Sequence, residues 1–391
     1  MRFRQFTILS VLLLWIAIVS AQETSEIQIE AIAHGLNNPR GVAVMPDGQL
    51  LVVEAGTGSD APDNIVGSGQ ILQLSDNNAD GDFDDEGERT VRLEAQPSFN
   101  SLAVYRTGHD EPFGLSDIIL MPDERVFFTR DHPFAEAGRN TGGEGYYGDV
   151  GIFILNTQRA GATRFVQRSA TLNSFAFDPV NERFFVTESG YNRIMAVDLN
   201  GEDEPEIIVD LPLLANNQQP VPSGIAYDPT TGDILVALFS GFVYDYVGTQ
   251  LGFMPGDAKV LRYSFETGEL TDEVTGLTTA IDVTVDDMGN VYVVELTTTW
   301  ESSPMPFDYD LTDPTLPPDP GGYARYTGRV TMYPVDGEMR VLADGLDAPT
   351  NITYHEGALY VSTALGTPQR RVQSARGIHA IDGVIYRITG F

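Results

Sequence analysis

Six residues of this 391-residue chain could do chemistry, and they fall into two columns of a repeated pattern. One column ends an apolar segment and contains Glu54, Glu188 and Glu295; the other opens an apolar segment and contains Asp117 and Asp282, with Asn173 one residue ahead of it. Their oxygens could together hold a hard cation such as Ca²⁺, or Glu188 or Glu295 could act as a catalytic base. Arg130 stands in the first column and Arg40 stands one residue ahead of the second, so an ion-pair network is a third interpretation.

A second candidate site is the acidic segment 76–88. Its spacing matches most positions of an EF-hand-type calcium loop, with candidate ligands at Asp76, Asn78, Asp80, Asp82 and Asp84. Gly81 stands where such a loop turns sharply, whereas Gly87 replaces the usual bidentate Glu. We expect a structural calcium site here; the alternative is a solvated acidic turn.

Composition excludes several other classes of site. With no cysteine, the chain has no thiolate zinc site, iron-sulfur cluster, covalently attached haem or lipoprotein anchor. The net charge of −33 disfavours nucleic acid as a partner and favours cations or sugars, although it could serve solubility alone. A glycine-rich match at 143–148 lies in a loop that leads into a strand, so we expect no nucleotide.

The first 21 residues have the pattern of a signal peptide. Arg2 and Arg4 precede an apolar run over 6–19, and small residues end at Ala21. The run is too short to cross a bilayer as an anchor. We expect cleavage after Ala21 and a secreted or periplasmic protein that is not integral to the membrane.

The columns belong to six β-hairpins, each an alternating apolar strand, a tight turn and a second apolar strand. The hairpins span Gly41 to Glu54, Asp117 to Arg130, Ser174 to Glu188, Gly224 to Leu238, Asp282 to Glu295 and Asn351 to Thr363. A third strand follows each hairpin, and usually a fourth. Repetition of this unit predicts an all-β fold, a six-bladed β-propeller of four antiparallel strands per blade in one domain over 22–391.

Ring closure requires one more strand, because the last blade has only three before the chain ends. Residues 27–33 form an alternating segment that leads into Gly35 and Leu36, as the fourth strands of other blades do. We therefore expect the N-terminal strand to complete the C-terminal blade.

The long insertions occupy the slot between the second and third strands, so they should all lie at one end of the channel. They are rich in Gly, Pro, Tyr and Phe, which favours a cup over the channel mouth. The cup could bind a small molecule, a sugar or a protein; alternatively, its aromatic residues pack the loops against each other.

The segments Gly35 to Gly48 and Leu51 to Gly56 resemble the start of the ScyD/ScyE family of exported propellers, and Thr187 to Ile194 resembles an NHL repeat. The chain as a whole is similar to the superfamily that contains the SMP-30/gluconolactonase enzymes. That resemblance implies a metal-binding role for Asn173. The chain departs from it at Arg40 and Gly41, where that family has Glu, and at Asp282, which is offset by one residue.

Two functions follow from these observations, and whether the chain is an enzyme stays open. The first is a ScyD/ScyE-like propeller that binds a ligand or partner in its cup and uses calcium structurally. The second is a calcium-dependent lactonase or hydrolase that uses Glu54, Asn173, Glu188, Asp282 and Glu295. A scaffold role is a third hypothesis.

Overall fold

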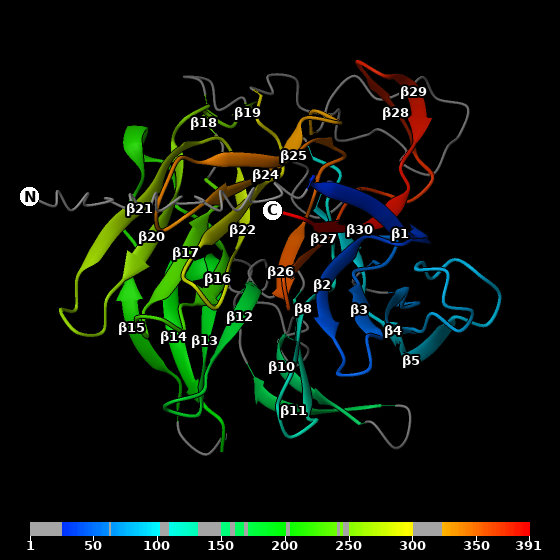
Figure 1. Cartoon of the computed structure of the whole chain (residues 1–391), viewed down its shortest axis with the longest axis horizontal. Helices are drawn as coiled ribbons and strands as arrows, with labels where there is room; N and C mark the ends of the chain where they lie inside the picture. Colours follow the sequence, from blue (N-terminus) through cyan, green and yellow to red (C-terminus); the bar gives the residue numbers. More distant parts are fainter. Residues whose placement is uncertain are drawn as a thin grey trace, which may run out of the picture.

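The regular secondary structure of the described chain is almost entirely β. The computed structural model describes residues 26–61, 64–101, 109–131, 150–156, 161–167, 171–200, 204–240, 243–244, 250–299 and 323–391. Six four-stranded antiparallel sheets form the blades of a β-propeller (Figure 1). The predicted fold class is therefore confirmed.

Each blade pairs consecutive strands from the axis outwards. Blade one contains β2 (Pro39–Val44), β3 (Leu50–Glu54), β4 (Gly69–Leu74) and β5 (Arg89–Gln96); blade two contains β8 (Leu115–Leu120), β9 (Val126–Arg130), β10 (Gly151–Leu155) and β11 (Ala162–Gln167); blade three contains β12 (Leu172–Asp178), β13 (Arg183–Glu188), β14 (Arg193–Asp198) and β15 (Glu206–Asp210). Blade four contains β16 (Pro222–Tyr227), β17 (Ile234–Leu238), β20 (Ala258–Tyr263) and β21 (Leu270–Leu277), and blade five contains β22 (Ala280–Val285), β23 (Val291–Glu295), β24 (Gly328–Tyr333) and β25 (Arg340–Leu346).

Blade six joins the two ends of the described chain, as the sequence predicted. It contains β26 (Asn351–His355), β27 (Ala358–Ser362), β30 (Gly383–Thr389) and, as its outer strand, β1 (Gln28–Leu36). The pairing of β1 with β30 runs antiparallel from Gln28 opposite Thr389 to Leu36 opposite Gly383. No blade is left with three strands, and β1 lies beside β30 in Figure 1.

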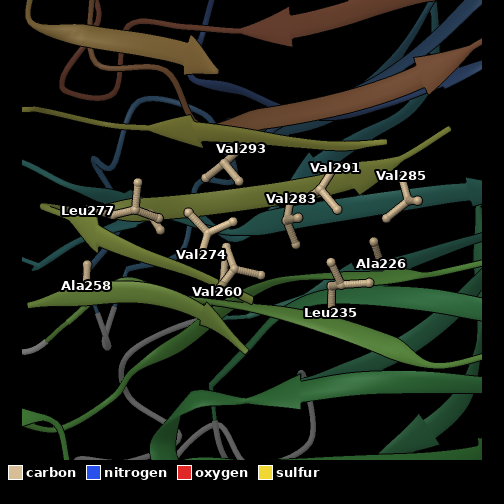
Figure 2. Packing of buried hydrophobic residues seen from close by; sticks show 12 residues of the cluster. Ala226, Leu235, Ala258, Val260, Val274, Leu277, Val283, Val285, Val291 and Val293 are labelled. Atoms are coloured by element: carbon tan, nitrogen blue, oxygen red, sulfur yellow. The ribbon is translucent and has the colours of Figure 1, made fainter. Parts of the chain in front are cut away.

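The hydrophobic core lies between neighbouring blades. Alternate apolar residues of each strand point to opposite faces of its sheet, so each blade packs on both neighbours. Figure 2 shows one such layer, in which Val260 and Val274 of blade four pack with Val283, Val291 and Val293 of blade five. This packing fixes the first strand of every blade along the central channel.

Short 3-10 helices and two-stranded sheets lie in the loops at one end of the channel. They are the 3-10 helices η1 (Ser189–Tyr191) and η2 (Ala215–Asn217), and the strand pairs β6 (Phe99–Asn100) with β7 (Pro112–Phe113), β18 (Val243–Tyr244) with β19 (Gln250–Gly252), and β28 (Arg371–Ser374) with β29 (Gly377–Ala380). Several of the predicted insertions lie here, whereas others fall outside the described residues.

Two further predictions concern the membrane. The predicted signal peptide, residues 1–21, lies outside the described residues. Over the ranges that the structure does describe, no helix has the length and apolar character needed to span a membrane.

Candidate functional site

A cavity of about 380 Å³ opens at the loop-rich end of the channel. Its floor is formed by the residues at the start of the six first strands, which we call the upper ring: Arg40, Ser116, Asn173, Ser223, Ile281 and Thr350. The fold thus places one residue from every blade at the same level. Five of the six carry a polar side chain that faces a space of small-molecule size.

Some polar groups of the upper ring hold neighbouring blades together. Thr350 Oγ1 donates to Pro39 O at 2.7 Å, and Ser223 Oγ donates to Ala280 O at 3.0 Å. Asn173 Nδ2 donates to Ser189 Oγ at 2.7 Å, while its Oδ1 atom accepts no hydrogen bond from the described residues. Asn173 therefore keeps an acceptor available to the cavity.

A second ring lies one residue further along the same strands. This waist ring contains Gly41, Asp117, Ser174, Gly224, Asp282 and Asn351. Ser174, Asp282 and Asn351 also line a cavity of about 470 Å³ at the opposite end of the channel, so the waist ring lies between the two cavities.

The waist ring consists of two similar triplets. Asp117 Oδ2 accepts hydrogen bonds from Ser174 Oγ at 2.7 Å and from the N–H of Phe175 at 3.2 Å. Asp282 Oδ2 accepts from Asn351 Nδ2 at 2.7 Å and from the N–H of Ile352 at 2.9 Å. In both triplets an aspartate of one blade is thus held by neutral donors of the next.

Glycines complete the triplets on the other side. A Cβ atom on Gly41 would lie 2.4 Å from Asp117 Oδ1, and one on Gly224 would lie 2.0 Å from Asp282 Oδ1. Only glycine fits at these positions, because the aspartate side chain lies directly against the backbone.

The waist aspartates are buried and have no cationic partner among their hydrogen-bond donors. Burial raises the pKa of Asp117 to about 6, although its hydrogen bonds from Ser174, Ile118 and Phe175 act to lower it. Burial also raises the pKa of Asp282 well above its usual range, and the negative charge of Asp117 adds to this effect. These two carboxylates, which the sequence analysis grouped in one column, lie in one ring of the structure.

One wall of the cavity carries a positive and a negative group. Arg40 Nη2 donates to Pro112 O at 2.9 Å, and Tyr323 OH donates to Glu111 Oε2 at 3.0 Å. Burial lowers the pKa of Arg40, against the opposing effect of Glu111. Burial raises the pKa of Glu111, against the opposing effects of Arg40 and the Tyr323 hydroxyl.

Aromatic rings form another part of the wall. Phe113, Phe239, Phe253 and Tyr323 line the cavity. The rings of Phe253 and Tyr323 are stacked at 6.0 Å, and Phe239 meets Phe253 edge-on at 4.8 Å. These packed rings give the cavity an apolar surface, and the Tyr323 hydroxyl joins that surface to Glu111.

The three glutamates of the other column do not line this cavity. Glu54 accepts from the N–H of Asn37 and from Gln70 Nε2, and Glu295 accepts from the N–H of Thr278 at 2.8 Å. These partners belong to the glutamate's own blade or the turn that enters it. Burial raises the pKa of Glu54.

Arginines of the same blades complete the partners of the other two glutamates. Glu188 is paired with Arg193 at 2.5 Å, and Glu295 with Arg329 at 2.6 Å. Arg130, at the same column position in blade two, is directed away from the channel: it donates to Gln96 Oε1 and lies over the ring of Phe153 at 4.2 Å. The column therefore consists of capping and pairing residues within blades.

The acidic segment 76–88 lies between β4 and β5. Its side chains fold back on its own backbone: Asp76 Oδ2 accepts from the N–H of Gly81 at 3.0 Å, and Asp82 Oδ1 accepts from the N–H of Asp84 at 3.0 Å. The segment also contacts the closing strand, because the N–H of Phe83 donates to Ile32 O at 2.8 Å. Within the described ranges, no three His, Cys, Asp or Glu side chains are arranged to hold a metal ion.

The sequence did not reveal Glu111 or Tyr323 as site residues. Both come from loops that differ between blades, so no column of the repeat marks them. The sequence indicated half of the upper ring, because Arg40, Asn173 and Ser223 each directly precede a residue of the waist ring. The residues at the same position in the other three blades complete the upper ring.

No family model matches the chain, and no curated protein matches it in sequence. Solved structures do resemble it. A gluconolactonase from Xanthomonas campestris superposes with a TM-score of 0.51 at 11% identity, over 93% of this chain and 89% of that one. A Bacteroides thetaiotaomicron protein of unknown function gives 0.50 at 13% identity, over 93% and 76%. At these identities the likeness concerns the propeller fold alone.

Proposed function

We propose that the chain is a binding propeller that holds a small molecule in the cavity above the upper ring. The observation that carries this proposal is a cavity of about 380 Å³ that combines an aromatic wall with polar groups whose hydrogen-bonding capacity is only partly used. Asn173 Oδ1 and most N–H groups of Arg40 form no hydrogen bond with the described residues. Sites for small molecules typically pair apolar surface with a few convergent polar groups in this way.

The proposal includes a place in the cell and a family. The pattern of residues 1–21 supports export to the periplasm or the medium. The segments Gly35 to Gly48 and Leu51 to Gly56 support a ScyD/ScyE-type protein.

A metal-dependent lactonase is the alternative function. Of the five residues that it would use, only Asn173 and Asp282 line the cavity, while Glu54, Glu188 and Glu295 are engaged within their blades. This arrangement favours ligand binding over hydrolysis as the better-supported proposal.

Blocking the cavity tests the binding proposal. Ser116 lines it, and its side chain makes no hydrogen bond to the described residues, so Ser116→Trp fills the space at little cost elsewhere. The probe is 3-phenylpropanol, a neutral aromatic alcohol, observed by saturation-transfer NMR. We expect binding to the parent and to the matched Ser116→Ala control, and at least tenfold weaker binding to Ser116→Trp. Equal binding to all three proteins, or to none, would refute the proposal.

We further propose that the acidic segment 76–88 binds a structural calcium ion. Its oxygen donors at alternate positions support this role, although their side chains would have to turn from backbone N–H groups to the ion. Because Phe83 is bonded to β1, calcium at this segment would also stabilise the ring closure.

Calcium titration followed by thermal melting tests this second proposal. Saturating calcium should raise Tm by several degrees, since about 2.7 kcal/mol is gained at a hundredfold excess over Kd. The double variant Asp80→Asn/Asp82→Asn should lose the shift. A matched control, Asp336→Asn/Glu338→Gln, removes two exposed charges from the corresponding loop of blade five and should keep it. An equal calcium-induced rise in Tm in both double variants would mean that calcium binds at another part of the protein.

A further inference from the structure

Two opposite charges face the cavity without pairing with each other. Arg40 and Glu111 both line it, yet no nitrogen of Arg40 lies within the 4.0 Å ion-pair distance of a carboxylate oxygen of the described chain. Arg40 donates to the carbonyl of Pro112, the residue that follows Glu111, so the two charged groups lie on the same wall and can act on one ligand.

Arg40 differs from the arginines that pair with buried carboxylates. Six described arginines do so at 2.5 to 3.1 Å: Arg183 with Asp178, Arg193 with Glu188, Arg262 with Asp228, Arg325 with Asp347, Arg329 with Glu295 and Arg370 with Asp110. Arg40 instead makes one hydrogen bond, to Pro112 O. A half-buried guanidinium that uses only one of its N–H donors toward the described residues can donate to a further acceptor in the cavity.

Glu111 has an oxygen atom that no described residue uses as a hydrogen-bond acceptor. Tyr323 OH donates to its Oε2 atom, and its Oε1 atom accepts no hydrogen bond from the described residues. The nearby carboxyl of Asp110 is already paired with Arg370 and does not compete for a ligand. A donor with positive charge would therefore find its best acceptor in this cavity at Glu111.

The balance of charge selects between ligand classes. Asp131 also acts on Arg40, so the surroundings of the guanidinium contain two carboxylates as well as the positive charge. A purely anionic ligand would be repelled by them, and a purely cationic ligand would leave Arg40 without an acceptor. A ligand with both charges satisfies Arg40 and Glu111 together.

We infer that the cavity binds a small zwitterion with an apolar body, of the chemical class of an α-amino acid. Its carboxylate accepts from Arg40, its ammonium donates to Glu111, and its side chain contacts Phe239, Phe253 and Tyr323. This inference rests on the proposed function, because it names the ligand class of the same cavity.

Matched probes separate the two charges. Phenylalanine carries both, 2-phenylethylamine lacks the carboxylate, 3-phenylpropionate lacks the ammonium, and 3-phenylpropanol carries neither. Isothermal titration should find phenylalanine at least about tenfold tighter than either singly charged probe, because each charge-assisted hydrogen bond that it adds is of that size or larger. Equal affinity for phenylalanine and either analogue would overturn the inference.

Variants assign each charge to its residue. Arg40→Gln should weaken phenylalanine about tenfold without weakening 2-phenylethylamine, whereas Glu111→Gln should weaken phenylalanine about tenfold without weakening 3-phenylpropionate, because each change also removes a like charge from the surroundings of that probe. Retained binding of 3-phenylpropanol shows that each variant keeps a folded cavity. If 3-phenylpropanol binds and the charged probes show no such pattern, the zwitterion inference fails while the proposed function stands. If no probe binds the parent protein, the proposed function itself fails.

Discussion

The glutamates that end the second strands and the aspartates of the waist ring are both buried carboxylates, but the protein stabilises them differently. Glu188 and Glu295 are neutralised by arginines of their own blades. Asp117 and Asp282 are held only by neutral donors, one in their own strand and two in the next blade. The first pair therefore strengthens single sheets, and the second links one sheet to another.

This difference teaches how position within a blade decides what a carboxylate can do. Glu188 and Glu295 lie on second strands, where an arginine of the neighbouring strand in the same sheet pairs with each of them. Asp117 and Asp282 lie on first strands at the axis, where strands of several blades converge and their hydrogen-bond donors include no cation. The raised pKa values of Asp117 and Asp282 follow from that location.

The largest expected effect separates the two kinds of carboxylate by neutral substitution. Glu188→Gln removes the charge that balances Arg193 and should lower the free energy of unfolding by about 3 to 5 kcal/mol. Asp282→Asn keeps the shape, loses at most one acceptor and relieves the repulsion with Asp117, so it should cost about 1 kcal/mol. Urea denaturation at neutral pH measures both values.

A double variant tests whether the stability lost in Glu188→Gln comes from the unpaired Arg193. Adding Arg193→Gln removes the unpaired guanidinium and should recover part of the stability lost in Glu188→Gln. If Asp282→Asn proves as costly as Glu188→Gln, the waist aspartate is charged and balanced by a group that its hydrogen bonds do not include, and the distinction drawn above is wrong.

Much of the fold was predictable because it repeats. The hairpins recur with alternating apolar residues, so the sequence predicted the blades and the closing strand β1 by comparison of segments with one another. The waist aspartates were predictable for the same reason. The glutamate column was expected to reach the channel as well, but repetition does not indicate that a second strand directs its final side chain into its own blade.

The remaining site residues could not be predicted from the repeat. Glu111 precedes β7 and Tyr323 lies between β23 and β24, and each is in a loop whose sequence does not repeat from blade to blade. The 3.0 Å hydrogen bond from the Tyr323 hydroxyl to Glu111 Oε2 forms only when two loops 212 residues apart in the sequence come together. Local patterns carry no information about such a contact, so the charged wall of the cavity became visible only in three dimensions.

The smallest expected effect is the pH dependence that the waist ring imposes on stability. The pKa of Asp117 is raised from 3.8 to about 6, so between these values the unfolded chain has released this proton while the native protein retains it. The contribution of Asp117 to the free energy of unfolding is therefore fully present below pH 3.8 and decreases as the pH rises. Above about pH 6 it is lost, and the total decrease is about 2 to 3 kcal/mol.

Asp117→Asn removes this titration and also lowers the repulsion on Asp282, which acts in the same direction. The free energy of unfolding of the variant minus that of the parent should therefore rise by about 2 to 3 kcal/mol from pH 4 to pH 7. Chemical denaturation at half-unit pH steps measures the difference, and Asp336→Asn on an exposed loop controls for the loss of a charge. A difference that stays constant, or falls with pH, would mean that the waist aspartates ionise as freely as surface carboxylates and that their neutral donors compensate fully for burial.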